Sequence, residues 1–221
     1  VKTMMQIGLL GFGVVGRGLY DLTQGREDIR VRKVLCLEDI TLPDATVTHD
    51  FHDILNDPEI DTVVEAMGGL HPAYEFVCAA LRAGKHVMSE VLPCETMAQA
   101  VELVEAVERS GKVYAYAENY CYMTHTFEMW RRYKTGEIGD VMYGEGEYIH
   151  DCSAIWPSIT YGERNHWRNL LTPTFYCTHS LGPLITITGL RPVRVVGFEM
   201  NHPEEMRSLG LIGGSAGLEI V

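Results

Sequence analysis

A glycine pattern near the N-terminus, GFGVVG at residues 11–16, constrains the fold of this chain more than any other feature. It follows a short apolar run, MMQIGLL, that predicts a strand, and it begins a stretch with helical spacing, VVGRGLYDLT. The glycines are Gly11, Gly13 and Gly16. Glycines in this spacing permit a tight turn, a close approach of the backbone to a pyrophosphate, and close packing of helix on strand. The pattern therefore predicts the first βαβ unit of a dinucleotide-binding domain.

Strand-like and helical segments alternate over residues 1–117. Further strands are expected within VRKVLCL, DTVVEAM, KHVMS and KVYAYA, and further helices at residues 72–83 and 97–110. Thr96 and Gln99 stand in capping-box spacing at the start of the last helix. Because strands that alternate with helices form right-handed βαβ units, we predict an α/β fold of the Rossmann type with a doubly wound, mostly parallel sheet.

The pattern changes after residue 118. A helix is expected at about residues 125–134, then a strand-like run, VMYGEGEYIHD, then a loop, a helix near 177–188 and a strand, PVRVVGFE. This order is typical of an α+β domain with a mostly antiparallel open sheet. We therefore predict a dinucleotide-binding domain at residues 1–119 and a domain for substrate binding and oligomerisation at residues 120–221. The strand-forming run at the end of the sequence predicts that this second domain is incomplete here.

Composition narrows the range of partners. The net charge of −12 argues against nucleic acid and anionic membranes, because both require a basic surface. A phosphate-bearing small molecule remains compatible with this charge, because backbone amides at a helix N-terminus can hold phosphate. No apolar run approaches the roughly 20 residues that span a bilayer, and the six cysteines include no CxxC pair. We expect a cytoplasmic protein without a metal site.

Candidate cofactor contacts follow the predicted strands. Glu38 and Asp39 come at the end of the second strand, where an acid binds the adenosine ribose hydroxyls, which favours NAD over NADP. Arg32 and Lys33 lie nearby in the sequence, so NADP remains a possible cofactor. The remaining candidates in this half are Phe12, Val14 and Val15 in the glycine turn, and Met67, Gly68, Gly69, His71 and Glu90 after later strands.

These segments together resemble the NAD(P)-dependent oxidoreductases of the Gfo/Idh/MocA family. The resemblance rests on the glycine turn and on AGKHVMSE, AVELVEAVERSGKVYAYAENY, GEIGDVMYGEGEY and THSLGPL. It implies NAD as cofactor, a carbohydrate or polyol substrate, and a homodimer or homotetramer. The segment VVEAMGGLHPA is also similar to homoserine dehydrogenase, a likeness that we expect to fade after residue 90.

The chain departs from the usual family pattern at two places. The family usually has Glu-Lys-Pro after the fourth strand, and that lysine commonly assists catalysis, whereas Glu90 is followed here by Val91 and Leu92. The family often has an aspartate four residues before a later histidine, where this chain has Phe175. A branch typified by the NAD-dependent α-N-acetylgalactosaminidases is more similar, as ENYCY, EYIHD and YCTHSLGP indicate. Those enzymes oxidise a sugar hydroxyl, eliminate the aglycone, add water and return the hydride.

The glycosidase resemblance implies a set of catalytic residues, namely Glu118, Tyr148, His150, Tyr176 and His179. Tyr148 and His150 share one face of a predicted strand, and Tyr176 and His179 share one face of a predicted helix. Histidine transfers protons near neutral pH, and tyrosine can pass on a hydroxyl proton. Judged without the resemblance, Glu118 could be an ordinary loop acid and Tyr148 a half-buried strand aromatic. His150 could be a surface residue, and His179 could cap a helix or bond a backbone carbonyl. Asn119, Trp167 and Arg168 are further candidates for contacts with cofactor or substrate, and Trp167 could equally anchor a loop.

These observations predict an NAD-dependent oxidoreductase that acts by hydride transfer on a carbohydrate or polyol hydroxyl. Three alternatives stay open at this point. They are a glycoside hydrolase that recycles its NAD, an enzyme similar to homoserine dehydrogenase, and a non-catalytic regulator that binds NAD.

Overall fold

The computed structural model describes residues 4–152, 154–201 and 214–220. The chain divides into two compact units, Val1–Ala117 and Glu118–Val221. The division falls close to the predicted domain boundary at residue 119. The functions expected of the two units remain predictions.

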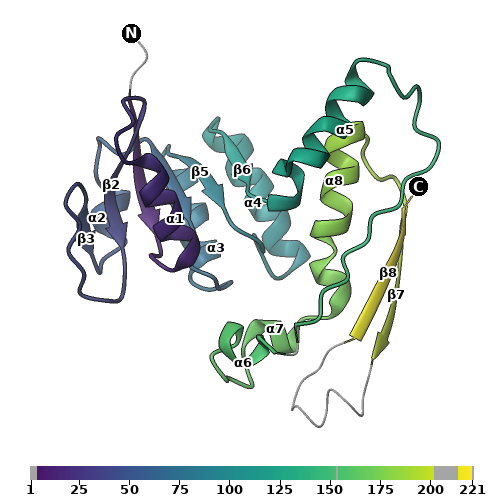
Figure 1. Ribbon diagram of the computed structural model, residues 1–221. Coiled ribbons are helices and arrows are strands. Elements are labelled where there is room, and N and C mark those ends of the chain that lie inside the picture. The colour runs from purple at the N-terminus through teal and green to yellow at the C-terminus, as the bar shows by residue number, and fades with distance from the viewer. Residues whose placement is uncertain (1–3, 153, 202–213, 221) are drawn as a thin grey trace. The chain divides into compact units, whose positions relative to one another are not determined.

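A parallel six-stranded sheet forms the centre of the N-terminal unit (Figure 1). Its strands are β1 (Met5–Leu10), β2 (Ile29–Leu35), β3 (Thr46–Thr48), β4 (Thr62–Glu65), β5 (His86–Ser89) and β6 (Tyr114–Tyr116). They pair in the order β3-β2-β1-β4-β5-β6, and every pair is parallel. The order reverses direction at β1, so the sheet is doubly wound, as the sequence predicts. β3 was not expected from the sequence.

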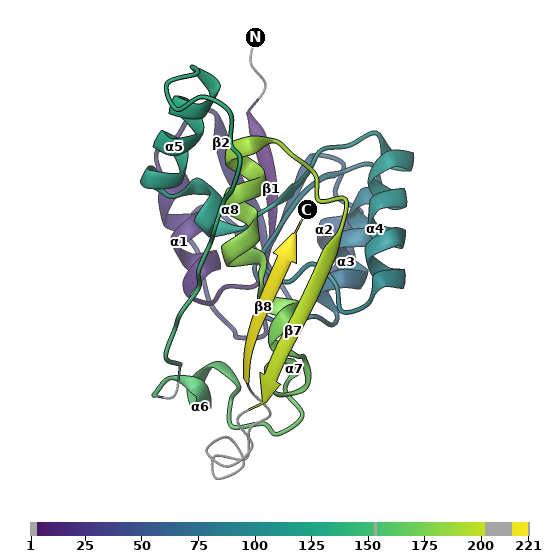
Figure 2. The ribbon, with the colours of Figure 1, turned by 90° about the vertical axis from the view of Figure 1, so that its right-hand side faces the viewer.

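Helices cover both faces of this sheet. They are α1 (Val14–Thr23), α2 (His52–Leu55), α3 (Ala73–Arg82) and α4 (Met97–Ser110). Figure 2 shows α1 on one side of the strands and α3 and α4 on the other. Alternate residues of β1 point to opposite faces, so Leu9 is buried in a cluster with Tyr20 of α1, and Leu10 in a cluster with residues of α2, α3 and α4. The sheet is therefore buried on both faces, as a parallel sheet requires.

The caps of α4 are those that the sequence predicts. Thr96 Oγ1 accepts a hydrogen bond from the Gln99 N–H at 3.2 Å, and the Gln99 side chain accepts one from the Thr96 N–H at 3.0 Å. Gly111 ends the helix in the left-handed conformation, with φ of 62°. Such an N-cap contributes about 1 kcal/mol, which helps to fix where this helix begins.

The C-terminal unit contains short helices and a two-stranded sheet. The elements are η1 (Asn119–Tyr122), α5 (Thr124–Lys134), α6 (Trp156–Ile159), α7 (Trp167–Leu170), η2 (Pro173–Tyr176), α8 (Thr178–Thr188), β7 (Val195–Asn201) and β8 (Gly214–Ile220). α5 and η1 pack against α8, and β7 pairs with β8 in an antiparallel arrangement. This confirms the expected α+β character. Among the residues that the structure describes, no helix is long and apolar enough to cross a membrane.

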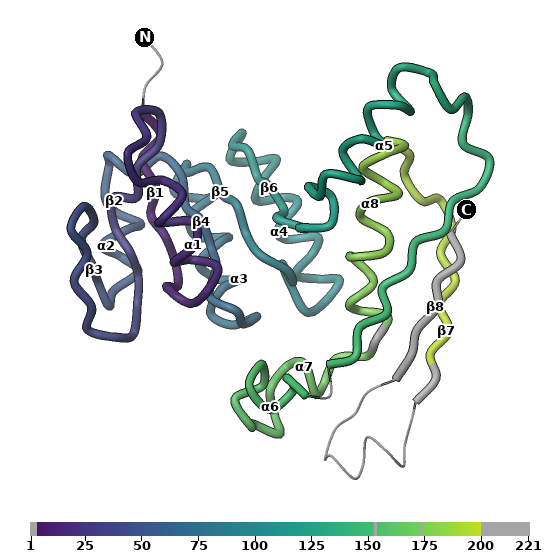
Figure 3. Tube along the Cα trace, in the orientation of Figure 1, coloured from purple at the N-terminus to yellow at the C-terminus, as the bar shows by residue number. Residues whose placement is uncertain are grey.

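One strand expected in this unit is absent from it. Residues 141–151 are extended but make no strand pairing among the described residues, and the tube in Figure 3 follows them along α8. A Cβ on Gly144 would lie 3.1 Å from Leu184 Cδ2, and a Cβ on Gly146 would collide with the Ser180 carbonyl. The glycines thus let this backbone lie directly on a helix instead of beside another strand. The prediction of a strand here was wrong. Alternation of apolar and polar residues indicates an extended backbone, but it does not indicate which element that backbone packs against.

Candidate cofactor and active sites

The glycine turn lies between β1 and α1, as predicted. Gly11 has φ of +91°, and a Cβ there would lie 2.5 Å from the Ala66 carbonyl oxygen at the end of β4. A Cβ on Gly16 would collide with the Gly11 carbonyl oxygen. Both positions therefore require glycine so that α1 can pack against the turn.

Gly13 serves a different purpose from the other two glycines. It is the N-cap of α1, and nothing lies within 4 Å of the position that a Cβ on it would take. No side chain caps α1, its first turn carries no acid, and Val14 has 92% of its surface exposed. The first amides of a helix have no partners within the helix, and the helix dipole favours an anion there. The turn thus fits the pyrophosphate of a dinucleotide. Phe12 packs edge-on against Tyr20, and Val15 is exposed.

The acids expected at the adenosine ribose follow β2, and both are exposed. The Asp39 carboxylate has 99% of its side-chain surface exposed and lies 3.0 Å from His49 Nε2. Glu38 donates its backbone N–H to Cys36 Sγ at 3.4 Å. The two acids therefore stand at the carboxyl end of the strand, where doubly wound folds bind ribose.

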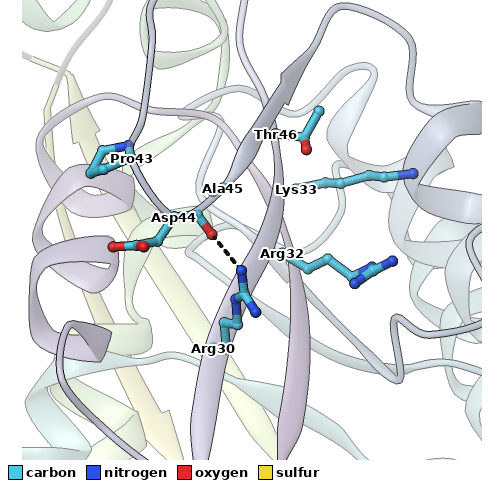
Figure 4. A pocket seen from close by; sticks show the side chains of 7 residues that line it. All are labelled: Arg30, Arg32, Lys33, Pro43, Asp44, Ala45 and Thr46. Atoms are coloured by element: carbon cyan, nitrogen blue, oxygen red, sulfur yellow. Dashed lines mark hydrogen bonds between the residues drawn. The ribbon is translucent and has the colours of Figure 1, made fainter.

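Arg32 and Lys33, the two cations that left NADP possible as the cofactor, both form ion pairs with Asp57. Arg32 Nε and Lys33 Nζ lie 3.0 and 2.9 Å from Asp57 Oδ2. Burial acts to raise the pKa of Asp57, but hydrogen bonds from Lys33, the Glu59 N–H and Arg32 lower it to about 2. Both side chains line a hollow of about 290 Å³ whose lining includes none of the predicted site residues (Figure 4). Their pairing with Asp57 supports NAD.

The loop after β4 is held by a buried acid that the sequence analysis missed. Glu65 is 4% exposed, and its Oε1 accepts a hydrogen bond from the Met67 N–H at 2.7 Å. Burial raises the pKa of Glu65 to about 7, and the charge of Glu90 also acts to raise it. An acid that ends an otherwise apolar strand, TVVE, was the available signal. Gly68, with φ of +76°, continues this loop, followed by Gly69.

His71 and Glu90 lie at the same edge of the sheet. The His71 ring is engaged on the surface, with Nδ1 2.6 Å from Glu75 Oε1 and Nε2 3.3 Å from Glu95 Oε2. Glu90 donates its N–H to the Glu65 carbonyl at 3.1 Å, and its carboxylate accepts from the Val91 N–H at 3.2 Å. Contacts of these two residues with the cofactor stay predictions.

In the C-terminal unit, a buried acid and a buried histidine form a pair. His179 Nδ1 lies 2.5 Å from Glu118 Oε1, and the two side chains are 6% and 4% exposed. The same oxygen accepts a hydrogen bond from the Tyr120 N–H at 3.2 Å. Because a carboxylate can only accept, His179 donates from Nδ1 and its neutral form carries the lone pair on Nε2. That arrangement prepares Nε2 to take a proton.

The pair depends on a glycine in α8. A Cβ on Gly182 would lie 2.9 Å from Glu118 Cγ and 3.0 Å from Cys121 Sγ. Only a residue without a side chain lets η1 approach the helix this closely. The position four residues before this histidine, where an aspartate was named in the sequence pattern, holds Phe175, and the acid in contact with His179 is Glu118.

Three tyrosine rings surround His179. The ring centroids of Tyr148, Tyr120 and Tyr176 lie 4.6, 4.8 and 5.0 Å from the imidazole. Tyr148 and Tyr176 were predicted, whereas Tyr120 was missed although ENYCY had been singled out. Tyr176 was expected on one helix with His179, but it ends η2, and Cys177 separates that turn from α8. The two rings nevertheless make contact.

A second pair of proton-handling groups adjoins the first. Tyr148 Oη lies 2.8 Å from His150 Nδ1. Burial raises the pKa of Tyr148 to about 12, so its phenol is protonated at neutral pH. The strand that was expected to bring these residues together is absent, yet extended backbone still places them on one side.

Two side chains of α7 adjoin the tyrosines around His179. The guanidinium carbon of Arg168 lies 4.3 Å from the Trp167 ring centroid and 5.5 Å from that of Tyr176. Such stacking holds a cation over aromatic faces. Asn119, the first residue of η1, follows Glu118 directly. All of these residues lie within the C-terminal unit.

A known protein family matches most of the N-terminal unit. Residues 11–117 match the family model described as the NAD binding domain of homoserine dehydrogenase. The match includes the glycine turn and every strand from β2 to β6.

The N-terminal unit is an NAD-binding Rossmann domain.

The likeness of this NAD-binding domain to homoserine dehydrogenase was expected to fade after residue 90. That expectation was wrong, because the match continues to residue 117. The geometry of the glycine turn and the exposed acids after β2 agree with NAD as the cofactor of this domain.

Similarity to glycosyl hydrolases extends beyond the NAD-binding domain. A glycosyl hydrolase family 109 protein of Shewanella sp. is 25% identical over 202 residues, covering 81% of this chain and 43% of that protein. An α-N-acetylgalactosaminidase of Bacteroides fragilis is 30% identical over 132 residues, covering 57% of this chain and 30% of that enzyme. The chain thus matches less than half the length of either relative.

A solved structure shares the fold over nearly all of the chain. A probable dehydrogenase from Thermotoga maritima aligns with a TM-score of 0.73 at 16% identity, covering 98% of this chain and 65% of that one. The predicted resemblance to the Gfo/Idh/MocA family, with its glycosidase branch, is confirmed by these comparisons.

Proposed function

We propose that the protein is an NAD-dependent oxidoreductase that transfers a hydride from a carbohydrate or polyol hydroxyl carbon. In this proposal the NAD-binding domain holds the hydride acceptor, and the C-terminal unit binds substrate and moves protons. The observation that carries the proposal is the buried Glu118–His179 pair, with an Nδ1–Oε1 distance of 2.5 Å.

Oxidation of an alcohol requires removal of the hydroxyl proton as the hydride leaves. Bound NAD supplies the hydride acceptor. His179 Nε2 accepts the proton, and the Glu118 carboxylate stabilises the imidazolium that results. The other carboxylate oxygen, Glu118 Oε2, is buried and has no hydrogen-bond partner among the described residues. A buried acceptor of this kind is costly unless a donor reaches it, and a substrate hydroxyl is such a donor.

The aromatic side chains around the pair suit a sugar or polyol. Tyr120, Tyr148 and Tyr176 present ring faces and edges to His179 and help to exclude water from it. Trp167 and Arg168 extend this surface, so that a ring can pack on the C–H groups of a sugar while the guanidinium donates to its oxygens.

A glycoside hydrolase that recycles its NAD is the second candidate, and the Tyr148–His150 pair favours it. A simple alcohol oxidation needs one base, whereas this site has two proton-handling pairs in ring contact. After oxidation, one base can remove the proton next to the new carbonyl while Tyr148 protonates the departing aglycone oxygen. Water then adds, and the hydride returns to carbon without net redox change. The absence of lysine at position 91 and the family 109 relatives also support this candidate.

Two other functions receive less support. The match to homoserine dehydrogenase ends at residue 117, before the residues of the proton-handling cluster. A non-catalytic NAD-binding regulator would have no use for a buried acid–histidine pair, which costs desolvation to maintain.

One experiment separates these functions. Purified protein with NAD is incubated with free sugars and polyols and with aryl glycosides, including N-acetylgalactosaminides, while aryl release and NADH absorbance are followed together. Net NADH from free sugars or polyols supports the dehydrogenase. Aryl release without net NADH supports the recycling hydrolase.

Two variants complete the experiment. His179→Ala is expected to abolish either signal, whereas His125→Asn, at an exposed histidine of α5, serves as the matched control and is expected to leave it unchanged. If the protein binds NAD tightly but neither signal appears with any substrate, the proposal is wrong.

A further inference from the structure

His49 touches one of the two acids predicted to bind the adenosine ribose. It directly follows β3, and its ring lies between two oxygens from the segment after β2. Nδ1 is 2.6 Å from the Cys36 carbonyl oxygen, and Nε2 is 3.0 Å from Asp39 Oδ1. Neither His49 nor this contact follows from the glycine pattern or from the spacing of the acids.

The two partners determine the protonation state that this geometry requires. A carbonyl oxygen and a carboxylate oxygen can both accept hydrogen bonds, and neither can donate one. A neutral imidazole carries a single N–H, so it can make only one of the two bonds. Both bonds together require hydrogen on both ring nitrogens, which is the imidazolium cation. The pKa of His49 is raised accordingly, first by the Cys36 carbonyl and then by Asp39.

The other charged side chains near His49 either pair with different groups or are exposed to solvent. Asp50, next to His49, accepts from His52 Nδ1 at 2.9 Å. Asp53 accepts from Thr48 Oγ1 at 2.5 Å. Arg32 and Lys33 are bound to Asp57, and Glu38 is exposed beside Asp39. Asp39 is therefore the carboxylate that faces the His49 ring, and His49 is the titratable cation that faces Asp39.

We propose that His49 determines cofactor specificity, because its protonation decides whether Asp39 is free to discriminate between NAD and NADP. When His49 is neutral, its one hydrogen stays on Nδ1 for the shorter bond to the Cys36 carbonyl, so Nε2 no longer donates to Asp39. The carboxylate then offers both oxygens to the ribose hydroxyls and repels a 2′-phosphate. When His49 is protonated, it occupies one oxygen and adds a positive charge beside the ribose site. The preference for NAD should then weaken as the pH falls.

The test uses binding and needs no turnover, so its failure is distinguishable from failure of the proposed activity. Dissociation constants of NAD and NADP are measured by titration calorimetry at about pH 6 and about pH 8.5, on either side of the ordinary histidine range. Wild-type protein is expected to prefer NAD roughly tenfold more strongly at the higher pH, because the charge of His49 beside the ribose site acts in opposite senses on the free Asp39 carboxylate and on a 2′-phosphate. The 2′-phosphate itself titrates near pH 6, so wild type is compared with variants under identical conditions.

Variants isolate the role of the imidazole. In His49→Asn the amide can still donate to the Cys36 carbonyl but cannot titrate, and His49→Gln provides a second, independent removal of the charge. Both should keep the strong NAD preference at both pH values. His52→Gln, which alters a similar histidine–carboxylate contact with Asp50, should behave as wild type.

Asp39→Asn should lower the NAD preference at both pH values and abolish its pH dependence. A wild-type pH dependence that persists unchanged in His49→Asn and His49→Gln would overturn the proposal. So would an NAD preference that does not change with pH in wild type, or one that Asp39→Asn does not affect.

Discussion

Glu118 and His179 are 61 residues apart in the sequence, and they meet as a buried pair in which His179 Nδ1 donates to Glu118 Oε1 at 2.5 Å. The contact fixes the imidazole tautomer and orientation from one side, and three tyrosine rings enclose it from others. An acid–histidine pair is thus present in this chain although the aspartate of the related pattern is replaced by Phe175. The acid that contacts His179 comes instead from a segment distant in the sequence.

Glu118→Gln tests whether this carboxylate contributes to catalysis. The amide oxygen can still accept from His179 Nδ1, so packing should be retained, but the negative charge that stabilises the imidazolium is lost. We expect the rate of hydride transfer to fall about 100-fold or more, with little change in the affinity for NAD. Turnover is compared with that of Glu128→Gln, at a surface acid on α5. Equal rates in Glu118→Gln and wild type would show that the carboxylate has no part in proton transfer.

Gly182→Ala tests the close approach of η1 to α8. The added methyl would lie 2.9 Å from Glu118 Cγ and 3.0 Å from Cys121 Sγ, so one of the two elements must shift. We expect the free energy of unfolding to fall by about 1–3 kcal/mol, as measured by urea titration. In Gly18→Ala, by contrast, the methyl meets nothing within 4 Å in α1, and helix propensity should raise stability by about 0.5–1 kcal/mol. Equal effects of the two substitutions would contradict the packing described here.

The glycine turn predicts different outcomes for two of its residues. A methyl on Gly16 collides with the Gly11 carbonyl, so Gly16→Ala should destabilise the NAD-binding domain. A methyl on Gly13 meets nothing of the protein, so Gly13→Ala should cost at most about 1 kcal/mol as an N-cap change. It should nevertheless weaken NAD binding roughly tenfold, because the methyl enters the space that the pyrophosphate takes. Calorimetric titration and thermal unfolding of both variants check this contrast.

The raised pKa of Glu65 predicts how the free energy of unfolding depends on pH. Burial raises its pKa in the folded protein to about 7, from an ordinary value of 4.5. Between these values the folded state holds a proton that the unfolded chain releases. Stability from this group therefore falls as the pH rises from about 4.5 to 7, by about 2–3 kcal/mol, and is constant above that range.

Glu65→Gln should remove this decline while still accepting the hydrogen bond from the Met67 N–H. Urea titrations of wild type and variant at about pH 5 and pH 8 measure the difference. Glu108→Gln, at an exposed acid of α4, is the control. If wild type and Glu65→Gln lose the same stability between the two pH values, Glu65 does not titrate in this range.

Much of the N-terminal unit could be predicted because its signals are local. The caps of α4 lie within the sequence they terminate, and the glycine turn needs only its neighbouring strand and helix. β3, a strand of three residues, is too short to show a pattern. In the C-terminal unit, the alternation at residues 141–151 indicated extended backbone, but a helix, not a strand, lies beside it.

The candidate site could be predicted in its residue types and not in its contacts. The motifs pointed to Tyr148 with His150 and to Tyr176 with His179, but not to the ring contact that joins the two pairs. The bond from His179 to Glu118 spans a distance in sequence that no periodicity reports, and it depends on Gly182. The contact of His49 with Asp39 could not be predicted either, because the loops after β2 and β3 meet only in the folded sheet.

Formation of NADH in a single turnover tests the central claim most directly. Protein saturated with NAD is mixed with the substrate that gives the strongest signal in the panel of sugars and glycosides, and NADH absorbance is followed by stopped flow. Both candidate reactions require hydride transfer, so wild type should show NADH, lasting for a dehydrogenase and transient for a recycling hydrolase. His179→Ala should show none on the same timescale. Substrate conversion without NADH at any time, or equally rapid NADH formation in His179→Ala, would contradict the account.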